Sequence, residues 1–216
     1  MLFIRKGSEP DSLIKYRKEK FAYYDGYEKK DDIRKKLLEE QGYLCAYCMR
    51  RINIKNMKIE HWYPEDRLSD VKKLEYSNML GVCTGHIEGT KGVDDTCDTH
   101  KGNILITVSP LDMSTLSKIK YRTSTGEIYS EDKQIQKDLN DTLNLNSSKH
   151  LLSINRKTVL NTVIMEMSKM QKKGIWSRRV IESIKEQYEK MDITGKKKEY
   201  AGIVLWYLNK KLKQKT

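Results

Sequence analysis

The sequence lacks any uninterrupted apolar run of the roughly 18 residues that a membrane-spanning helix requires. Its first residues also lack the apolar stretch of a secretory signal peptide. No internal repeat is present, and apolar residues make up only 38% of the chain, although 3 Trp and 13 Tyr can still contribute to a core. The length of 216 residues therefore predicts one compact cytoplasmic domain, or one domain with an appendage.

Positive charge is in excess and unevenly distributed. The chain has 42 Lys and Arg residues against 30 Asp and Glu, a formal net charge of +12. Residues 1–100 contribute 19 basic and 18 acidic side chains, whereas residues 101–216 contribute 23 and 12, a net charge of +11. This asymmetry indicates that the second half faces a polyanion, such as nucleic acid, or an acidic partner. A lysine-rich surface that is merely solvated would have the same composition.

Hydrophobic periodicity predicts an α+β protein. Short apolar segments bounded by turn residues indicate strands, and apolar residues every three or four positions indicate helices. The predicted elements are helices over 11–23 and 31–42, a hairpin over 43–54, strands beginning at 58 and 104, a hairpin over 119–129, and amphipathic helices over 159–170, 180–191 and 200–212. The chain is accordingly divided into an N-terminal segment and helix (1–40), a core that contains every cysteine (41–110), and a hairpin with a basic helical region (111–216).

Cysteine is scarce, and the only four are Cys45, Cys48, Cys83 and Cys97. A reducing intracellular environment disfavours disulfides between them. Cys45 and Cys48 form a Cys-x-x-Cys motif, which occurs both in redox centres and in metal sites. A redox centre would lie between a strand and a helix, but here a helix precedes the motif and a predicted strand follows it. The pattern favours structural zinc bound by all four thiolates, with His86 or His100 as the alternative to one of them.

A second group of polar residues is interleaved with the cysteines, and it consists of Glu60, His61, Asn78, Asp98, His100 and Lys101. An imidazole such as that of His61 can take a proton from water near neutral pH. Carboxylate and amide oxygens suit Mg²⁺, which can stabilise the leaving oxygen of a phosphodiester, and Lys101 can neutralise phosphate charge. Each residue taken alone also has a structural interpretation, with Asn78 in a turn and Asp98 as a helix N-cap.

The order of these motifs resembles that of the zinc-bearing HNH endonucleases. The Cys-x-x-Cys motif comes first, then an acid–His pair followed by Pro64, then Asn-x-Leu-x-x-Cys from Asn78, and finally Cys-x-x-x-Lys from Cys97. The stretches that most resemble the PtuB type of this family are 4–10, 40–51, 59–62, 76–83 and 97–103. Nucleases of that type are effectors of Septu antiphage systems and of retron cassettes that carry the same effector pair.

The resemblance implies a fold and a set of residue roles. Residues 41–110 would form a zinc-stabilised ββα-metal core of the HNH or His-Me finger type, with a mainly α-helical part after it. His61 would be the general base, and Glu60 would bind a catalytic Mg²⁺ or Mn²⁺. Asn78 would either orient His61 and its loop or bind this metal, and the four cysteines would hold structural zinc.

Two departures from the family pattern leave choices open. Asp98 stands where His or Asn is usual, so either Asp98 or His100 is the third motif residue. Asp98 would be a hard ligand for Mg²⁺, and His100 would bind the metal, a phosphate or the zinc. Thirteen residues, 84–96, also separate the last two cysteines, and this loop could carry Lys91 or His86 to the substrate or could be a solvated bulge.

The function implied by the resemblance is metal-dependent cleavage of phosphodiester bonds in nucleic acid during antiphage defence. DNA is the favoured target, and an RNA or tRNA target for the same site is the alternative. The resemblance further implies a complex with an ABC-like ATPase of the PtuA type, and in some systems also with a retron reverse transcriptase and its DNA. A binding module that uses zinc without catalysis is the remaining alternative, although it would not require the Glu60-His61 pair.

Overall fold

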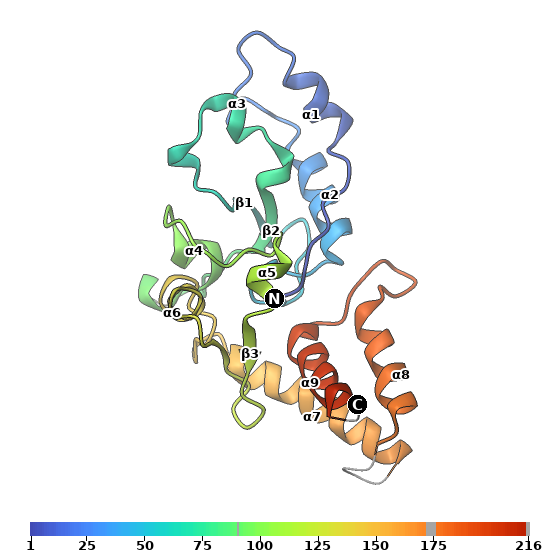
Figure 1. Cartoon of the computed structure of the whole chain (residues 1–216). Helices are drawn as coiled ribbons and strands as arrows, with labels where there is room; N and C mark the ends of the chain where they lie inside the picture. Colours follow the sequence, from blue (N-terminus) through green and yellow to red (C-terminus); the bar gives the residue numbers. More distant parts are fainter. Residues whose placement is uncertain (90, 172–175, 215–216) are drawn as a thin grey trace.

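The computed structural model describes residues 1–89, 91–171 and 176–214. Its elements are α1 (Asp11–Tyr16), α2 (Lys30–Gln41), β1 (Met57–His61), η1 (Glu65–Arg67), α3 (Asp70–Lys73), η2 (Tyr76–Asn78), β2 (Met79–Cys83), η3 (Gly92–Asp94), α4 (Cys97–Lys101), α5 (Met113–Leu116), β3 (Ile119–Tyr121), β4 (Ile128–Ser130), α6 (Lys133–Lys137), η4 (Asp138–Thr142), α7 (Leu152–Met170), α8 (Arg178–Glu189) and α9 (Ala201–Lys213). The protein is α+β, as the sequence predicts, with two small antiparallel sheets and a helical C-terminal part (Figure 1). Within the described ranges, no helix has both the length and the apolar character needed to cross a membrane.

The β1–β2 sheet is the centre of the first half of the chain. Its antiparallel register places Glu60 opposite Leu80 and His61 opposite Met79. Helix α2 packs against this sheet and ends at Gly42, whose φ of 62° is the left-handed conformation that favours glycine. The buried side chain of Gln41 then bonds both the N–H and the C=O of Gly81 in β2, at 2.7 Å each. Gln41 therefore fixes the position of β2 against α2.

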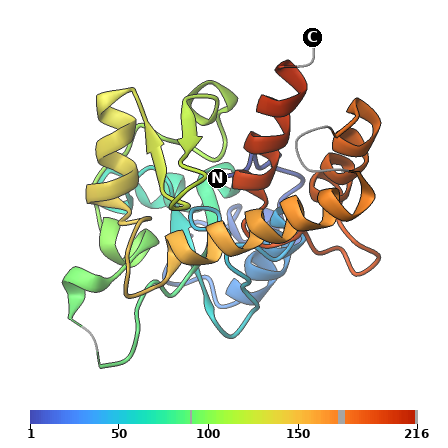
Figure 2. The ribbon, with the colours of Figure 1, turned by 90° about the horizontal axis from the view of Figure 1, so that it is seen from below.

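The C-terminal helices α7, α8 and α9 pack on one another, and α9 also contacts β3 (Figure 2). Their buried apolar residues recur every three or four positions and include Leu160, Val163, Met167, Ile181, Ile184, Val204 and Leu208. This helical unit is joined to the first half by backbone hydrogen bonds from Lys197 N to Gly42 O (3.0 Å) and from Tyr200 N to Met49 O (3.1 Å). One continuous hydrophobic core includes residues from both halves.

Most predicted elements are confirmed, with shifts at their ends. The helix predicted over 11–23 ends at Tyr16, and the hairpin predicted over 43–54 is reduced to a single bridge between Leu44 and Arg51. The strand predicted from 104 is wrong, because this segment pairs with no other strand among the described residues. The buried Asp138 instead accepts hydrogen bonds from Thr107 N (2.6 Å) and Val108 N (2.9 Å).

Candidate functional site

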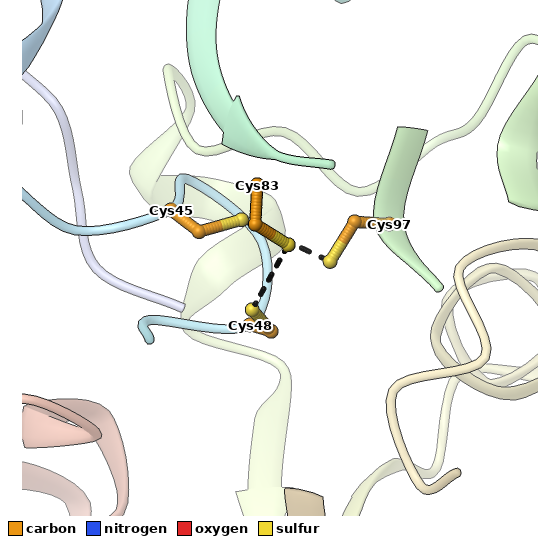
Figure 3. Close-up of side chains that lie close together, drawn as sticks. All are labelled: Cys45, Cys48, Cys83 and Cys97. Atoms are coloured by element: carbon orange, nitrogen blue, oxygen red, sulfur yellow. Dashed lines mark hydrogen bonds between the residues drawn. The ribbon is translucent and has the colours of Figure 1, made fainter. Parts of the chain in front are cut away.

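The four cysteines meet in one buried cluster, as the sequence predicts (Figure 3). Their sulfur atoms all lie within 4.8 Å of one another, and the Cys45–Cys97 and Cys48–Cys83 pairs are both 3.8 Å apart. Tetrahedral zinc with Zn–S bonds of about 2.3 Å requires sulfur atoms about 3.8 Å apart. The geometry of the cluster therefore fits a closed tetrathiolate zinc site.

Three segments of the chain supply these cysteines. Cys45 and Cys48 lie on a tight turn that is closed by hydrogen bonds from Met49 N to Cys45 O (3.0 Å) and from Cys45 N to Arg50 O (2.9 Å). Met49 has a φ of 64°, the left-handed conformation that lets the chain reverse within one residue. Cys83 ends β2, and Cys97 begins α4. A single ion at this position would tie the turn, the sheet and α4 together.

The electrostatics of the cluster also favour a bound cation. Burial raises the pKa of the Cys97 thiol well above its ordinary value, and the neighbouring thiols raise it further. Against burial, hydrogen bonds from the other thiols and the charge of Arg50 hold the pKa of Cys48 well below its ordinary value. Burial of the sulfur atoms therefore penalises accumulation of negative charge on the cluster. A divalent ion removes this penalty, and its binding releases protons.

Neither histidine that the sequence offered as an alternative ligand belongs to the cluster. His86 Nδ1 lies 2.6 Å from Asp95 Oδ1, and His100 Nδ1 lies 3.0 Å from the carbonyl oxygen of Thr142. A group of three or more Cys, His, Asp or Glu side chains can hold a metal when its ligand atoms lie close enough to one another. The four cysteines form the one such group among the described residues.

A cleft of about 550 Å³ opens between the end of β1, the η1 turn and α4. The polar residues that line it include Lys58, Glu60, His61, Glu65, Asp98 and Lys101. Successive side chains of a strand point to opposite faces, so Glu60 contacts α4 whereas His61 contacts the carbonyl at the end of α3. The cleft is thus lined by both the carboxylates and the imidazole that the motifs single out.

Glu60 lies at the centre of a buried polar network. Its Oε1 atom accepts a hydrogen bond from the Tyr47 hydroxyl (2.9 Å) and lies 2.8 Å from the Lys101 ammonium. Burial, a hydrogen bond with Asp98 and the charge of Asp98 raise the pKa of Glu60 to about 8, against the opposing effect of Lys101. The pKa of Asp98 is lowered despite its burial, by Glu60 and by Lys58. The two shifts run in opposite directions, so Glu60 is the carboxyl group of the pair that holds a proton more readily, and Lys101 opposes that protonation.

His61 is almost fully buried, with its ring edge-on to Tyr24 at a centroid distance of 4.8 Å. Its Nε2 atom lies 2.7 Å from the carbonyl oxygen of Lys73, which can only accept a hydrogen bond. Nε2 must therefore carry a proton, which leaves Nδ1 as the nitrogen that can act as a base. Glu65 Oε1 lies 2.6 Å from Nδ1, a distance that requires a proton between the two atoms, so Nδ1 is available as a base only when Glu65 has moved away. This contact with His61 lowers the pKa of Glu65.

Asn78 fixes the loop that follows His61. Its side-chain oxygen accepts a hydrogen bond from Tyr63 N (2.8 Å), and its amide nitrogen donates to Tyr63 O (3.0 Å). The backbone oxygen of Asn78 also accepts from Trp62 N (3.0 Å). The described residues that line the cleft do not include Asn78. Of its two predicted roles, the geometry matches orientation of the loop and not binding of a metal.

The structure separates several predicted site residues from the cleft. His100 turns away from it toward Thr142, and Asp98 rather than His100 lies beside Glu60. Lys91 is exposed on the loop over 84–96, and this loop is closed by a hydrogen bond from Thr96 N to Gly85 O (2.7 Å). Residue 90 of this loop lies outside the described residues. The Lys101 ammonium is in the cleft wall, but it is buried against Glu60 rather than exposed to solvent.

Sequence reasoning missed four residues of this region, namely Tyr47, Lys58, Glu65 and Lys73. Glu65 has a weak signal in the sequence, since it follows His61 by four residues and the intervening Pro64 favours a turn. The Tyr47 hydroxyl and the Lys73 carbonyl have no such signal, because they reach the site only through tertiary packing.

Comparison with known proteins does not assign the chain to a family. No protein-family model matches it, and no curated protein matches it in sequence.

The zinc site is tested by the substitution Cys48→Ser. Loss of one thiolate leaves three ligands, so we expect zinc measured by atomic absorption to fall well below one ion per chain. Structural zinc contributes several kcal/mol to folding, and the melting temperature should therefore fall by about 10 °C or more. His100→Gln is the matched control and should retain one zinc ion. A soluble Cys48→Ser protein that holds a full equivalent of zinc would contradict the assignment.

Proposed function

We propose that this protein is a metal-dependent HNH endonuclease that hydrolyses phosphodiester bonds in nucleic acid. The observation that carries the proposal is that Glu60, His61 and Asp98 all line one cleft, close to the cluster of four cysteines. These residues lie on β1 and α4, and the order β1, β2, α4 supports a ββα-metal core. The resemblance of the motifs to PtuB-type nucleases supports the same assignment.

His61 would act as the general base. Its Nε2–H is fixed by the carbonyl of Lys73, and the hydrogen bonds of Asn78 hold the loop on which the ring depends. Nδ1 can then accept a proton from a water molecule that attacks phosphorus in line with the leaving oxygen. Glu65 occupies the space in front of Nδ1, so it must rotate away before water enters. Its position on the η1 turn, with 43% of the side chain exposed, permits this rotation.

Glu60 and Asp98 would hold the catalytic Mg²⁺ or Mn²⁺. Mg²⁺ is commonly bound through one or two carboxylates, with water and substrate phosphates completing its shell, and this adjacent pair fits that requirement. A bound divalent ion would supply charge stabilisation at the phosphate and at the leaving oxygen. Zinc at the cysteines would take no part in the reaction, because a closed tetrathiolate shell leaves no position for substrate.

The proposed biological setting is antiphage defence in a complex with an ABC-like ATPase of the PtuA type, in some systems together with a retron reverse transcriptase and its DNA. The charge of the second half, +11, supports contact with a nucleic acid or with an acidic face of a partner. DNA is the proposed target, and RNA, including tRNA, is the alternative for the same site. Assays of the complex on both polymers distinguish these targets.

The role of His61 is tested by His61→Ala. Loss of a general base lowers the rate by about 10²- to 10⁴-fold. Cleavage of plasmid DNA, single-stranded DNA and RNA should be measured with Mg²⁺, with the proposed ATPase partner present. Zinc content should remain at one ion per chain, since His61 is not a zinc ligand.

His86→Ala is the matched control for this experiment, because His86 is half-exposed and is not among the described residues that line the cleft. It should cleave at the wild-type rate. Undiminished cleavage by zinc-loaded His61→Ala would rule out His61 as the base. No cleavage of any polymer by the wild-type complex would favour the binding module.

Metal binding should depend on pH, because the carboxyl group of Glu60 must lose its proton before it can bind a metal. Its pKa is raised to about 8, so at lower pH a divalent ion must displace the proton from this carboxyl group. The affinity for Mn²⁺ should rise by about tenfold per pH unit below 8 and then level off above it. Calorimetric titration of the zinc-loaded protein between pH 6.5 and 8.5 measures this. Glu60→Gln should bind weakly throughout, whereas a wild-type affinity that is independent of pH would contradict the role of Glu60.

A further inference from the structure

Lys101 is a buried cation at the place where the proposed function requires a metal. Its side chain is only 1% exposed, and its ammonium lies 2.8 Å from Glu60 Oε1 and 3.3 Å from the carbonyl oxygen of Gly102. Lysine is almost never fully buried unless its charge is paired. The pairing with Glu60 explains why the fold tolerates this charge, and it also means that Glu60 already has a cation in contact with it.

A second lysine contacts the same carboxyl pair from outside. Lys58 Nζ lies 2.7 Å from Asp98 Oδ2 and 3.1 Å from Thr99 Oγ1, and the Lys58 side chain is 44% exposed. Lys58 can leave Asp98 for solvent at little cost, because water solvates its ammonium. Lys101 is instead enclosed in the wall of the cleft, so its ammonium can leave Glu60 only by moving into the cleft. The two lysines are therefore suitable for comparison, because each contacts one carboxyl group of the same pair but their burial differs.

We propose that the Lys101 ammonium occupies the cation position of the Glu60–Asp98 pair until a divalent ion displaces it into the cleft. The inference rests on the proposed function, because it takes this pair to be the metal site. A divalent ion that joins Lys58 and Lys101 would leave the pair with excess positive charge, and this excess opposes its binding. The displaced ammonium would then lie free in the cleft, where a backbone phosphate of the substrate can pair with it. Lys101 would thus weaken metal binding in the free enzyme and assist substrate binding after the metal has entered.

The competition is tested by the dissociation constant for Mn²⁺, measured by calorimetry on the zinc-loaded chain. Lys101→Met removes the competing charge and keeps much of the buried volume, so at pH 8.5, where the proton on Glu60 competes least, Mn²⁺ should bind about tenfold more tightly or better. Lys58→Met is the matched control and should change the constant by less than about threefold, because an exposed pair contributes little. Lys101→Gln, which retains a hydrogen-bond donor without the charge, should behave as Lys101→Met if the latter does not fold.

A measurement on the unaltered protein gives an independent test. Acetylation of lysines by N-hydroxysuccinimidyl acetate, followed by mass spectrometry, reports which ammonium groups solvent can reach. Lys101 should be protected in the zinc-loaded protein and should become several-fold more reactive when Mn²⁺ is added, whereas Lys58 should react under both conditions.

The outcomes separate this inference from the proposed function. If Mn²⁺ binds in a manner that depends on Glu60, but Lys101→Met does not bind it more tightly and Lys101 stays protected, the displacement is refuted and the metal site stands. If no preparation binds Mn²⁺, the proposed metal-dependent function is itself refuted, and the displacement with it.

Discussion

The meeting of four sulfur atoms in one buried cluster is the constraint on which the first half of this structure depends. The cysteines come from the turn at 45–48, the end of β2 and the start of α4, and the stretch between Cys83 and Cys97 forms a long loop. Only the ends of that loop need to meet, so its interior is free to vary. The sulfur atoms also lie at the separations that tetrahedral zinc requires, so an ion at their centre would fix all three segments at once.

The cleft is a consequence of that constraint. Cys97 begins α4, and two further residues of this short helix contact β1. Asp98 pairs with Lys58, and Lys101 pairs with Glu60. A helix of five residues is too short to be stable by itself, so the position of α4 depends on contacts such as the one that the cluster makes. We therefore expect loss of the cysteine cluster to disturb the acid pair and its two lysines. Zinc would act on the chemistry by placing these groups.

The sequence predicts the parts of this site that depend on residue type and order. The spacing of the chain's four cysteines indicates a zinc site, and the Glu60-His61 pair that lies between them in the sequence indicates a catalytic site. The contacts of Lys101 with Glu60 and of Glu65 with His61 could not be predicted, because they depend on how α4 and η1 pack against β1. The strand expected from 104 failed for a similar reason. Its apolar pattern is real, but Asp138, far away in sequence, takes the hydrogen bonds that a neighbouring strand would have made.

An ion at the four cysteines would hold the turn, the sheet and α4 in place. X-ray absorption spectroscopy at the zinc K-edge of the purified chain reports both the identity and the number of the ligands. We predict one zinc ion per chain with four sulfur neighbours at about 2.3 Å. A shell that contains nitrogen or oxygen, or a folded protein with intact cysteines and no zinc, would contradict the claim that this cluster organises the site.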